Sequence, residues 1–222
     1  MPKLTSFAAP HGSAHRPWLT RVGHRVARGG RAGADMPAAV LPGWYGKLPA
    51  LGDFAGRRLP PLFVEPWDRW LAAGLGLWRQ SDEAWIDEFL AAPVWRFALG
   101  AGVPFELSPG YAGVLMPSVD RVGRYFPLTV VRPRGRHENH APAAWLQSLE
   151  GIAVAALNDD WDAERLDAEL AGLDDASDSG PAWPQEGRTL WWCERDGQLS
   201  TPVSTTGLPE ADAFARLLAG RL

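Results

Sequence analysis

Hydrophobic residues recur at helical spacing in several stretches of the chain. The clearest helix is predicted to open at Glu65 and Pro66, because proline is tolerated in a first helical turn. Its apolar stripe consists of Trp67, Trp70, Leu71, Leu75 and Trp78, with Asp68, Arg69 and Arg79 turned away from it. Further helices are predicted over 85–90, behind a cap formed by Ser81, Asp82 and Glu83, and over 145–157, 161–173 and 210–222.

Shorter apolar runs predict the strands. These runs cover residues 43–48, 94–99, 111–116, 126–131 and 189–194. Glycines and prolines in residues 49–61 predict a loop there, and residues 132–142 and 174–184 are expected to be a polar loop and a surface linker. The two runs that flank residues 117–125 are expected to be antiparallel neighbours.

The order of these elements indicates the fold class. Strands and helices follow one another as β-α-α-β-β-β-α-α-β-α, without the strict alternation of a doubly wound parallel sheet. The pattern predicts an α/β protein of the α+β type. We expect a mixed, largely antiparallel sheet with helices packed on its faces, in a single domain over residues 41–222.

The composition indicates the cellular compartment of the protein. The chain has 222 residues, 46% of them hydrophobic, and 12 tryptophans, which predict a core built on large flat side chains. Its one cysteine, Cys193, lies in an apolar run and is expected to be a small buried residue on a strand. No apolar run is long enough to span a membrane, and no secretory signal is visible. We therefore expect a cytoplasmic protein.

Charge is unevenly distributed. The net charge is −4, yet residues 1–40 are basic, so the remainder is strongly acidic. We interpret residues 1–40 as a disordered basic tail. Alternatively, the translation start is assigned too far upstream (an over-called start), because Met36 stands just before the ordered-looking sequence. Attachment of this tail to an anionic surface is a weaker hypothesis. The acidic body argues against binding of nucleic acid.

The sequence contains few candidate catalytic or metal-binding motifs. No phosphate-binding glycine motif opens a helix and no nucleophile elbow is present. Ser118 and Asp120 could form part of a hydrolase triad only if folding brought His137 or His140 to them. The His137–His140 segment has a metal-ligand spacing, but its arginine-rich surroundings favour a solvated loop. No catalytic, cofactor-binding or metal-binding residue is therefore assigned.

Two charged loops are the remaining candidates for function. One spans residues 52–58, and the other spans 120–125 between two predicted strands. One interpretation is an internal network in which Asp53 or Asp120 binds Arg124; the other is a surface for a protein partner, where arginine and aromatic residues are common anchors. The candidate partner-binding residues are Arg57, Arg58, Asp68, Arg69, Arg121 and Arg124. The residues expected to build the motif itself are Asp53, Phe54, Trp67, Asp120, Gly123 and Tyr125.

Four segments together carry a family resemblance. They are Gly43–Pro49, Gly52–Phe54, Trp67–Leu71 and Val114–Thr129, and in this order they resemble the TagF (ImpM) family of type VI secretion accessory proteins. The resemblance implies a cytoplasmic bacterial protein that negatively regulates assembly or firing of the secretion machine after translation. It also implies a link to a forkhead-associated (FHA) scaffold protein and to the kinase–phosphatase pair of that pathway.

Two functional hypotheses result. The first is a regulatory binder without enzymatic activity that captures the FHA scaffold, since the family has no established catalytic residues to carry over. The second is a small hydrolase that uses Ser118 and Asp120 with a loop histidine.

Overall fold

Neighbouring residues on the strands enter two different hydrophobic cores, because successive side chains of a strand point to opposite faces of the sheet. The structure is a computed structural model that describes residues 41–81, 84–173 and 179–221. Trp191 and Trp192 are neighbours on one strand, yet Trp191 packs in one core and Trp192 packs in the other. Both faces of the sheet are therefore covered, as the buried runs on its central strands require.

Eight strands of the described part of the chain form one antiparallel sheet. Its order is β2-β1-β5-β4-β3-β6-β7, and β8 also pairs with β6. The strands are β1 (Gly43–Gly46), β2 (Ala55–Arg57), β3 (Trp95–Leu99), β4 (Tyr111–Met116), β5 (Leu128–Pro133), β6 (Arg188–Arg195), β7 (Gln198–Leu199) and β8 (Val203–Thr206). β4 and β5, which flank the second charged loop, are antiparallel neighbours, as the sequence predicts.

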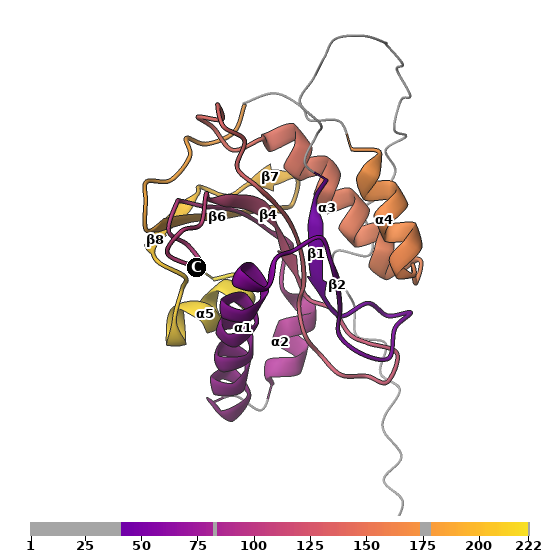
Figure 1. Cartoon of the computed structure of the whole chain (residues 1–222). Helices are drawn as coiled ribbons and strands as arrows, with labels where there is room; N and C mark the ends of the chain where they lie inside the picture. The colour runs from indigo at the N-terminus through magenta and orange to yellow at the C-terminus, as the bar shows by residue number, and fades with distance from the viewer. Residues whose placement is uncertain (1–40, 82–83, 174–178, 222) are drawn as a thin grey trace, which may run out of the picture.

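Helices cover the two faces in separate groups (Figure 1). Helices α1 (Pro61–Ser81), α2 (Trp85–Ala91) and α5 (Ala211–Leu218) lie on one face, and α3 (Ala143–Asn158) and α4 (Ala163–Ala171) lie on the other. The result is a three-layer α+β arrangement, which confirms the predicted fold class. No helix among the described residues is long and apolar enough to cross a membrane.

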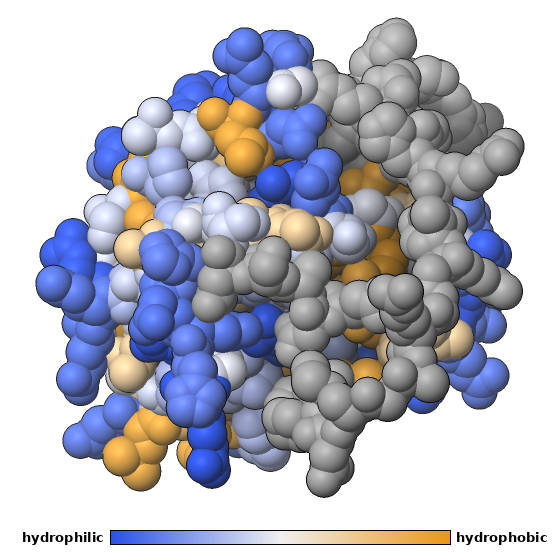
Figure 2. Space-filling model, turned by 90° about the horizontal axis from the view of Figure 1, so that it is seen from above, coloured by the Kyte–Doolittle hydropathy of each residue, from blue (hydrophilic) through white to orange (hydrophobic). Residues whose placement is uncertain are grey.

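Tryptophan builds much of both cores. Of the tryptophans that the structure describes, ten are buried, at positions 44, 67, 78, 85, 95, 145, 161, 183, 191 and 192. Trp67 is fully buried and lies within 6.4 Å, ring to ring, of Trp191, while its indole N–H donates to Thr129 Oγ1 at 2.8 Å. Hydrophilic residues cover most of the described surface seen from above, and hydrophobic residues appear there in separate small areas (Figure 2). That face has the character of an ordinary solvated surface.

Several predicted boundaries are wrong. The segment 49–61 was expected to be all loop, but Ala55–Arg57 forms β2 and pairs with β1. Helix α1 begins at Pro61, not at Glu65, because Pro60 provides the first carbonyl acceptors, for the N–H groups of Phe63 and Val64. Pro66 is therefore one turn inside the helix.

Other differences are smaller. β5 begins at Leu128 instead of Phe126 and continues through Pro133. β7 and β8 were not predicted. The residue that precedes α2 is Ala84, whose side chain makes no cap. Asp82 and Glu83 of the predicted cap lie outside the described residues. The predicted tail over residues 1–40 and the middle of the predicted linker also lie outside them.

Candidate functional site

The loop between β4 and β5 is organised around one buried carboxylate. Asp120 accepts hydrogen bonds at Oδ1 from the backbone N–H groups of Val122 (3.0 Å) and Arg124 (2.9 Å). Gly123, with φ at 83°, allows the tight turn in which its own N–H donates to the Asp120 carbonyl. The loop is thus closed by its own aspartate, and its exposed residues are held in a defined geometry.

Two cations bind the other oxygen of the same carboxylate. Lys47 Nζ lies 2.6 Å from Asp120 Oδ2, and Arg124 Nε donates to this oxygen at 2.7 Å. Burial alone would raise the pKa of Asp120, but hydrogen bonds from Lys47, Arg124 and Val122 outweigh it and hold the pKa well below its ordinary value. Asp120 is therefore ionised and ties β1 to the loop, 73 positions away in sequence.

Arg124 connects this loop to the other charged loop. Its guanidinium donates to the carbonyl of Gly52 and lies 3.7 Å from Asp53, which is 82% exposed. The Arg121 backbone N–H donates to the Leu51 carbonyl at 3.0 Å, while its side chain is exposed. The internal Asp–Arg network considered from the sequence is therefore present, and the two charged loops form one surface.

Ser118 has a structural contact. It is buried, and its hydroxyl donates to the Lys47 carbonyl at 2.6 Å. His137 and His140 follow β5, whereas Ser118 precedes it, so the six residues of β5, about 20 Å of extended chain, separate them. The structure does not bring either histidine to Ser118 as the hydrolase hypothesis requires.

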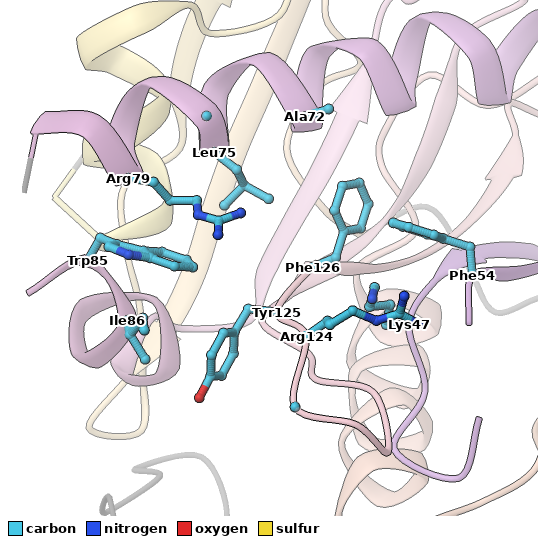
Figure 3. Close-up of a pocket in the computed structure, with 12 residues that line it drawn as sticks. Lys47, Phe54, Ala72, Leu75, Arg79, Trp85, Ile86, Arg124, Tyr125 and Phe126 are labelled. Carbon is cyan, nitrogen blue, oxygen red and sulfur yellow. The ribbon is translucent and has the colours of Figure 1, made fainter. Parts of the chain in front are cut away.

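A groove opens beside the Asp120 loop (Figure 3). It has a volume of about 570 Å³ and lies between the second half of α1, the start of α2 and the loop. Its lining residues are Lys47, Phe54, Ala72, Leu75, Gly76, Arg79, Trp85, Ile86, Gly123, Arg124, Tyr125 and Phe126. This volume is in the range of about 300–1,000 Å³ that is usual for ligand sites.

Aromatic rings form the walls of the groove. Phe54 and Phe126 meet edge to face with centroids 4.8 Å apart at one end, and Trp85 and Tyr125 meet at 5.8 Å at the other. Phe54 is 44% exposed, which is high for a phenylalanine that makes such ring contacts. These rings offer a rigid apolar surface of the kind that dominates protein interfaces.

Cations lie on both sides of these rings. The Arg79 guanidinium lies 4.9 Å from the centre of the Trp85 ring, and Lys47 Nζ lies 4.8 Å from that of Phe54. Arg79 extends from α1 and Arg124 from the loop, so that they approach the groove from opposite sides (Figure 3). The groove thus combines an apolar floor with a positively charged rim.

Arg57 and Arg58 lie elsewhere, against α4. Both bind Asp167, with Nη1 of Arg57 at 2.9 Å and Nη2 of Arg58 at 2.6 Å. Burial opposes ionisation of Asp167, but hydrogen bonds from Arg58 and from the Trp44 indole, with the charges of both arginines, lower its pKa. The two arginines therefore connect the edge strand β2 to the opposite helical layer while their side chains stay partly exposed.

The remaining predicted residues are distributed over α1 and the loop. Asp68 accepts a 2.6 Å hydrogen bond from the Tyr45 hydroxyl; burial and this contact raise the pKa of Tyr45. Arg69 is exposed on α1, and Tyr125 is half-buried against Trp85. The structure thus brings Arg121 and Arg124 together, but it does not place Arg57, Arg58 or Arg69 on the groove.

The His137–His140 segment makes contacts within the fold, and the cysteine is buried in it. Within the His137–His140 segment, Glu138 binds the Arg132 guanidinium and accepts from the Gly135 N–H. The described residues contain no group of three or more side chains suited to a metal ion. Cys193 is buried on β6, as the sequence predicts.

Sequence reasoning missed most of the groove. Arg79 was expected to turn away from the apolar stripe, yet it lines the groove with Ala72, Leu75 and Gly76. These four residues lie three or four positions apart on one side of α1, which is the only signal that the sequence offers. Lys47 and Trp85 join them only through the packing of β1 and α2, which no local pattern reveals.

The geometry defines a class: an α+β protein that presents a rigid, arginine-bearing loop beside an aromatic groove. The chain belongs to the TagF family of type VI secretion-associated proteins, since residues 43–173, more than half of its length, match the model of the TagF N-terminal domain. This match extends about forty residues beyond the segments that carry the resemblance in the sequence.

A solved structure supports the fold. The crystal structure of PA0076 from Pseudomonas aeruginosa PAO1 is similar to this chain, with a TM-score of 0.68 and 31% sequence identity. The similarity covers 81% of this chain and 94% of that one. No protein with a curated description matches the chain.

Proposed function

We propose that this protein is a negative regulator of type VI secretion that acts after translation, in the cytoplasm, by binding an FHA-containing scaffold component rather than by catalysis. Capture of the scaffold would withhold it from the secretion machine. The kinase–phosphatase pair of the pathway would then control how much scaffold is free to be captured.

The observation that carries this proposal is that, in a member of the TagF family, hydrogen bonds to Asp120 hold the loop between β4 and β5 in a fixed shape. The loop exposes Arg121 and the tip residue Val122, 65% exposed, beside an aromatic groove. A loop that is ordered before binding loses little conformational freedom when a partner docks, which favours affinity. Of the six candidate residues, Arg121 and Arg124 belong to this surface, whereas Arg57 and Arg58 lie against α4, and Asp68 and Arg69 lie on α1 outside the groove.

Calorimetry tests the proposal directly. The full chain would be titrated against the FHA-containing scaffold encoded with the same secretion cluster, with and without phosphorylation of the scaffold. We expect a dissociation constant of about 1 µM or lower in one of the two states. Heat in neither state would overturn capture of the scaffold as the function.

A charge-reversal variant tests the surface. Arg121→Glu should weaken scaffold binding by at least about tenfold. Because this side chain is exposed, the thermal midpoint should move by no more than about 3 °C. The matched control reverses one exposed arginine elsewhere, Arg136, and should bind normally. A large loss of stability in the Arg121→Glu variant would show that this arginine holds the fold instead.

A further inference from the structure

The groove has a charge balance that selects its occupant. Three cations line it, Lys47, Arg79 and Arg124, while the carboxylates beside them are Asp120 and the exposed Asp53. Among the described residues, one positive charge is therefore left over. The groove is complementary to a segment that brings one negative charge.

The remaining charge is located at Arg79. Lys47 is only 3% exposed and is bound to Asp120, and Arg124 uses its Nε and one terminal nitrogen on Asp120 and Gly52. The Arg79 guanidinium lies over Trp85, and no carboxylate of the residues that the structure describes pairs with it. An anion in the groove would therefore meet Arg79 as its main donor.

A single guanidinium fits a carboxylate better than a phosphate. An Arg–carboxylate pair needs one planar fork of two N–H donors. A phosphorylated side chain carries about −1.5 to −2 charges, and its usual sites provide a cluster of arginines with donors to spare. Here the second arginine is already committed to Asp120.

The space next to Arg79 is apolar. A Cβ added at Gly76 would meet no atom within 4 Å, so the floor is open there. Leu75 is buried below it, and Trp85 and Tyr125 form the adjacent wall. This space suits one large aliphatic or aromatic side chain, of the kind that anchors peptide segments.

We infer that the groove between α1, α2 and the Asp120 loop binds a short peptide segment with one aspartate or glutamate beside one bulky apolar residue. The carboxylate pairs with Arg79, and the apolar side chain packs over Gly76 between Leu75 and Trp85. This inference rests on the proposed function in that the scaffold would carry the segment.

Peptide selection tests the inference without the scaffold. Short random peptides displayed on phage would be selected on the full chain, and the enriched ones synthesised. They should contain an acidic residue next to a bulky apolar one. Replacing that acidic residue by its amide should weaken binding at least about tenfold. Enriched peptides without an acidic residue, or synthetic versions that bind only when phosphoserine replaces it, would overturn the inference.

Two variants locate the site. Gly76→Trp fills the groove, and Arg79→Glu reverses its charge; each should weaken peptide binding at least about tenfold. The controls are Gly151→Trp, at a helical glycine of α3 where an added Cβ also meets nothing within 4 Å, and Arg136→Glu, at an exposed arginine beyond β5. Circular dichroism checks that each variant folds, and Arg79→Glu alone is sufficient for the test if Gly76→Trp does not fold. Peptides that bind the folded groove variants normally would place the site elsewhere and overturn the inference.

The scaffold titration separates the two proposals. If the scaffold binds the unmodified chain and the Gly76→Trp variant equally, capture of the scaffold stands and the groove is not its site. If peptides bind in the groove but the scaffold gives no heat, the groove stands as a site and the scaffold is not its partner.

Discussion

A buried ion pair fixes the shape of the surface loop at the scale of single residues. Asp120 has no exposed side-chain surface and is bound by two cations and two backbone N–H groups. Such a carboxylate is costly to bury alone but well compensated here. The sequence shows that the loop is rich in charge, but the partner Lys47 belongs to a segment far away in the chain, so only the fold reveals the pairing.

Replacing this carboxylate should change stability in a pH-dependent way. Asp120→Asn leaves Lys47 buried without its counterion and should lower the free energy of unfolding by about 3 kcal/mol at pH 7. The pKa of Asp120 is lower in the folded than in the unfolded chain, where it has its ordinary value of 3.8. On acidification the unfolded chain therefore takes up the proton first. The stability that this group contributes is present above its ordinary pKa and is lost as the pH falls below it.

Urea unfolding at pH 7 and at steps below about pH 4.5 measures both effects. The decline in stability with acid should be shallower in Asp120→Asn than in the unmodified protein. Asp53→Asn is the control, because Asp53 also lies near Arg124 but is largely exposed. It should change stability by less than about 1 kcal/mol. Equal behaviour of the two variants would contradict a structural role for the buried pair.

At the scale of elements, two glycines of α1 have opposite surroundings. An added Cβ at Gly74 would lie 2.4 Å from the Phe214 ring of α5, so this glycine permits the close packing of the two helices. The equivalent atom at Gly76 would enter open space at the groove. One helix thus uses glycine once for packing and once where a side chain would narrow a surface cavity.

Alanine at these two positions should therefore act with opposite signs. Gly76→Ala should stabilise the protein by about 0.5–1 kcal/mol, since it removes only the entropy cost of a helical glycine. Gly74→Ala should destabilise it by about 1–3 kcal/mol, because the Phe214 ring has to move. Thermal and urea unfolding of the two variants check this pair. Stabilisation by both substitutions would show that the contact between α1 and α5 is looser than the structure indicates.

Sequence periodicity predicted the long elements as well as β1 and α2, but failed on β2, β7 and β8. β3, β4 and β6 follow apolar runs, and α3 follows a clear stripe, because burial imposes a regular pattern over enough residues to be visible. β2 and β7 have two or three largely exposed residues each and are strands only through pairing with β1 and β6. The groove was missed for the same reason, since its walls come from elements that meet only in the folded chain.

At the scale of the whole molecule, one sheet is shared by two cores. Strand β4 contributes Val114 to the core under α3 and α4, and Leu115 to the core under α1, α2 and α5. Neither helical layer can leave the sheet without exposing one side of its central strands. We therefore expect the two layers to unfold together.

A cavity in either core should lower the midpoint of one and the same unfolding transition. Leu115→Ala opens a cavity in the core under α1, and Leu149→Ala opens one in the core under α3; both residues are fully buried. Each should cost about 2–5 kcal/mol, and far-ultraviolet circular dichroism and tryptophan fluorescence should report one coincident midpoint in each variant. Exposed Leu62→Ala is the control and should change stability by less than about 0.5 kcal/mol. Two separate transitions in either variant would mean that a helical layer unfolds on its own. In that case the groove, which lies on the layer of α1 and α2, could open without loss of the core under α3.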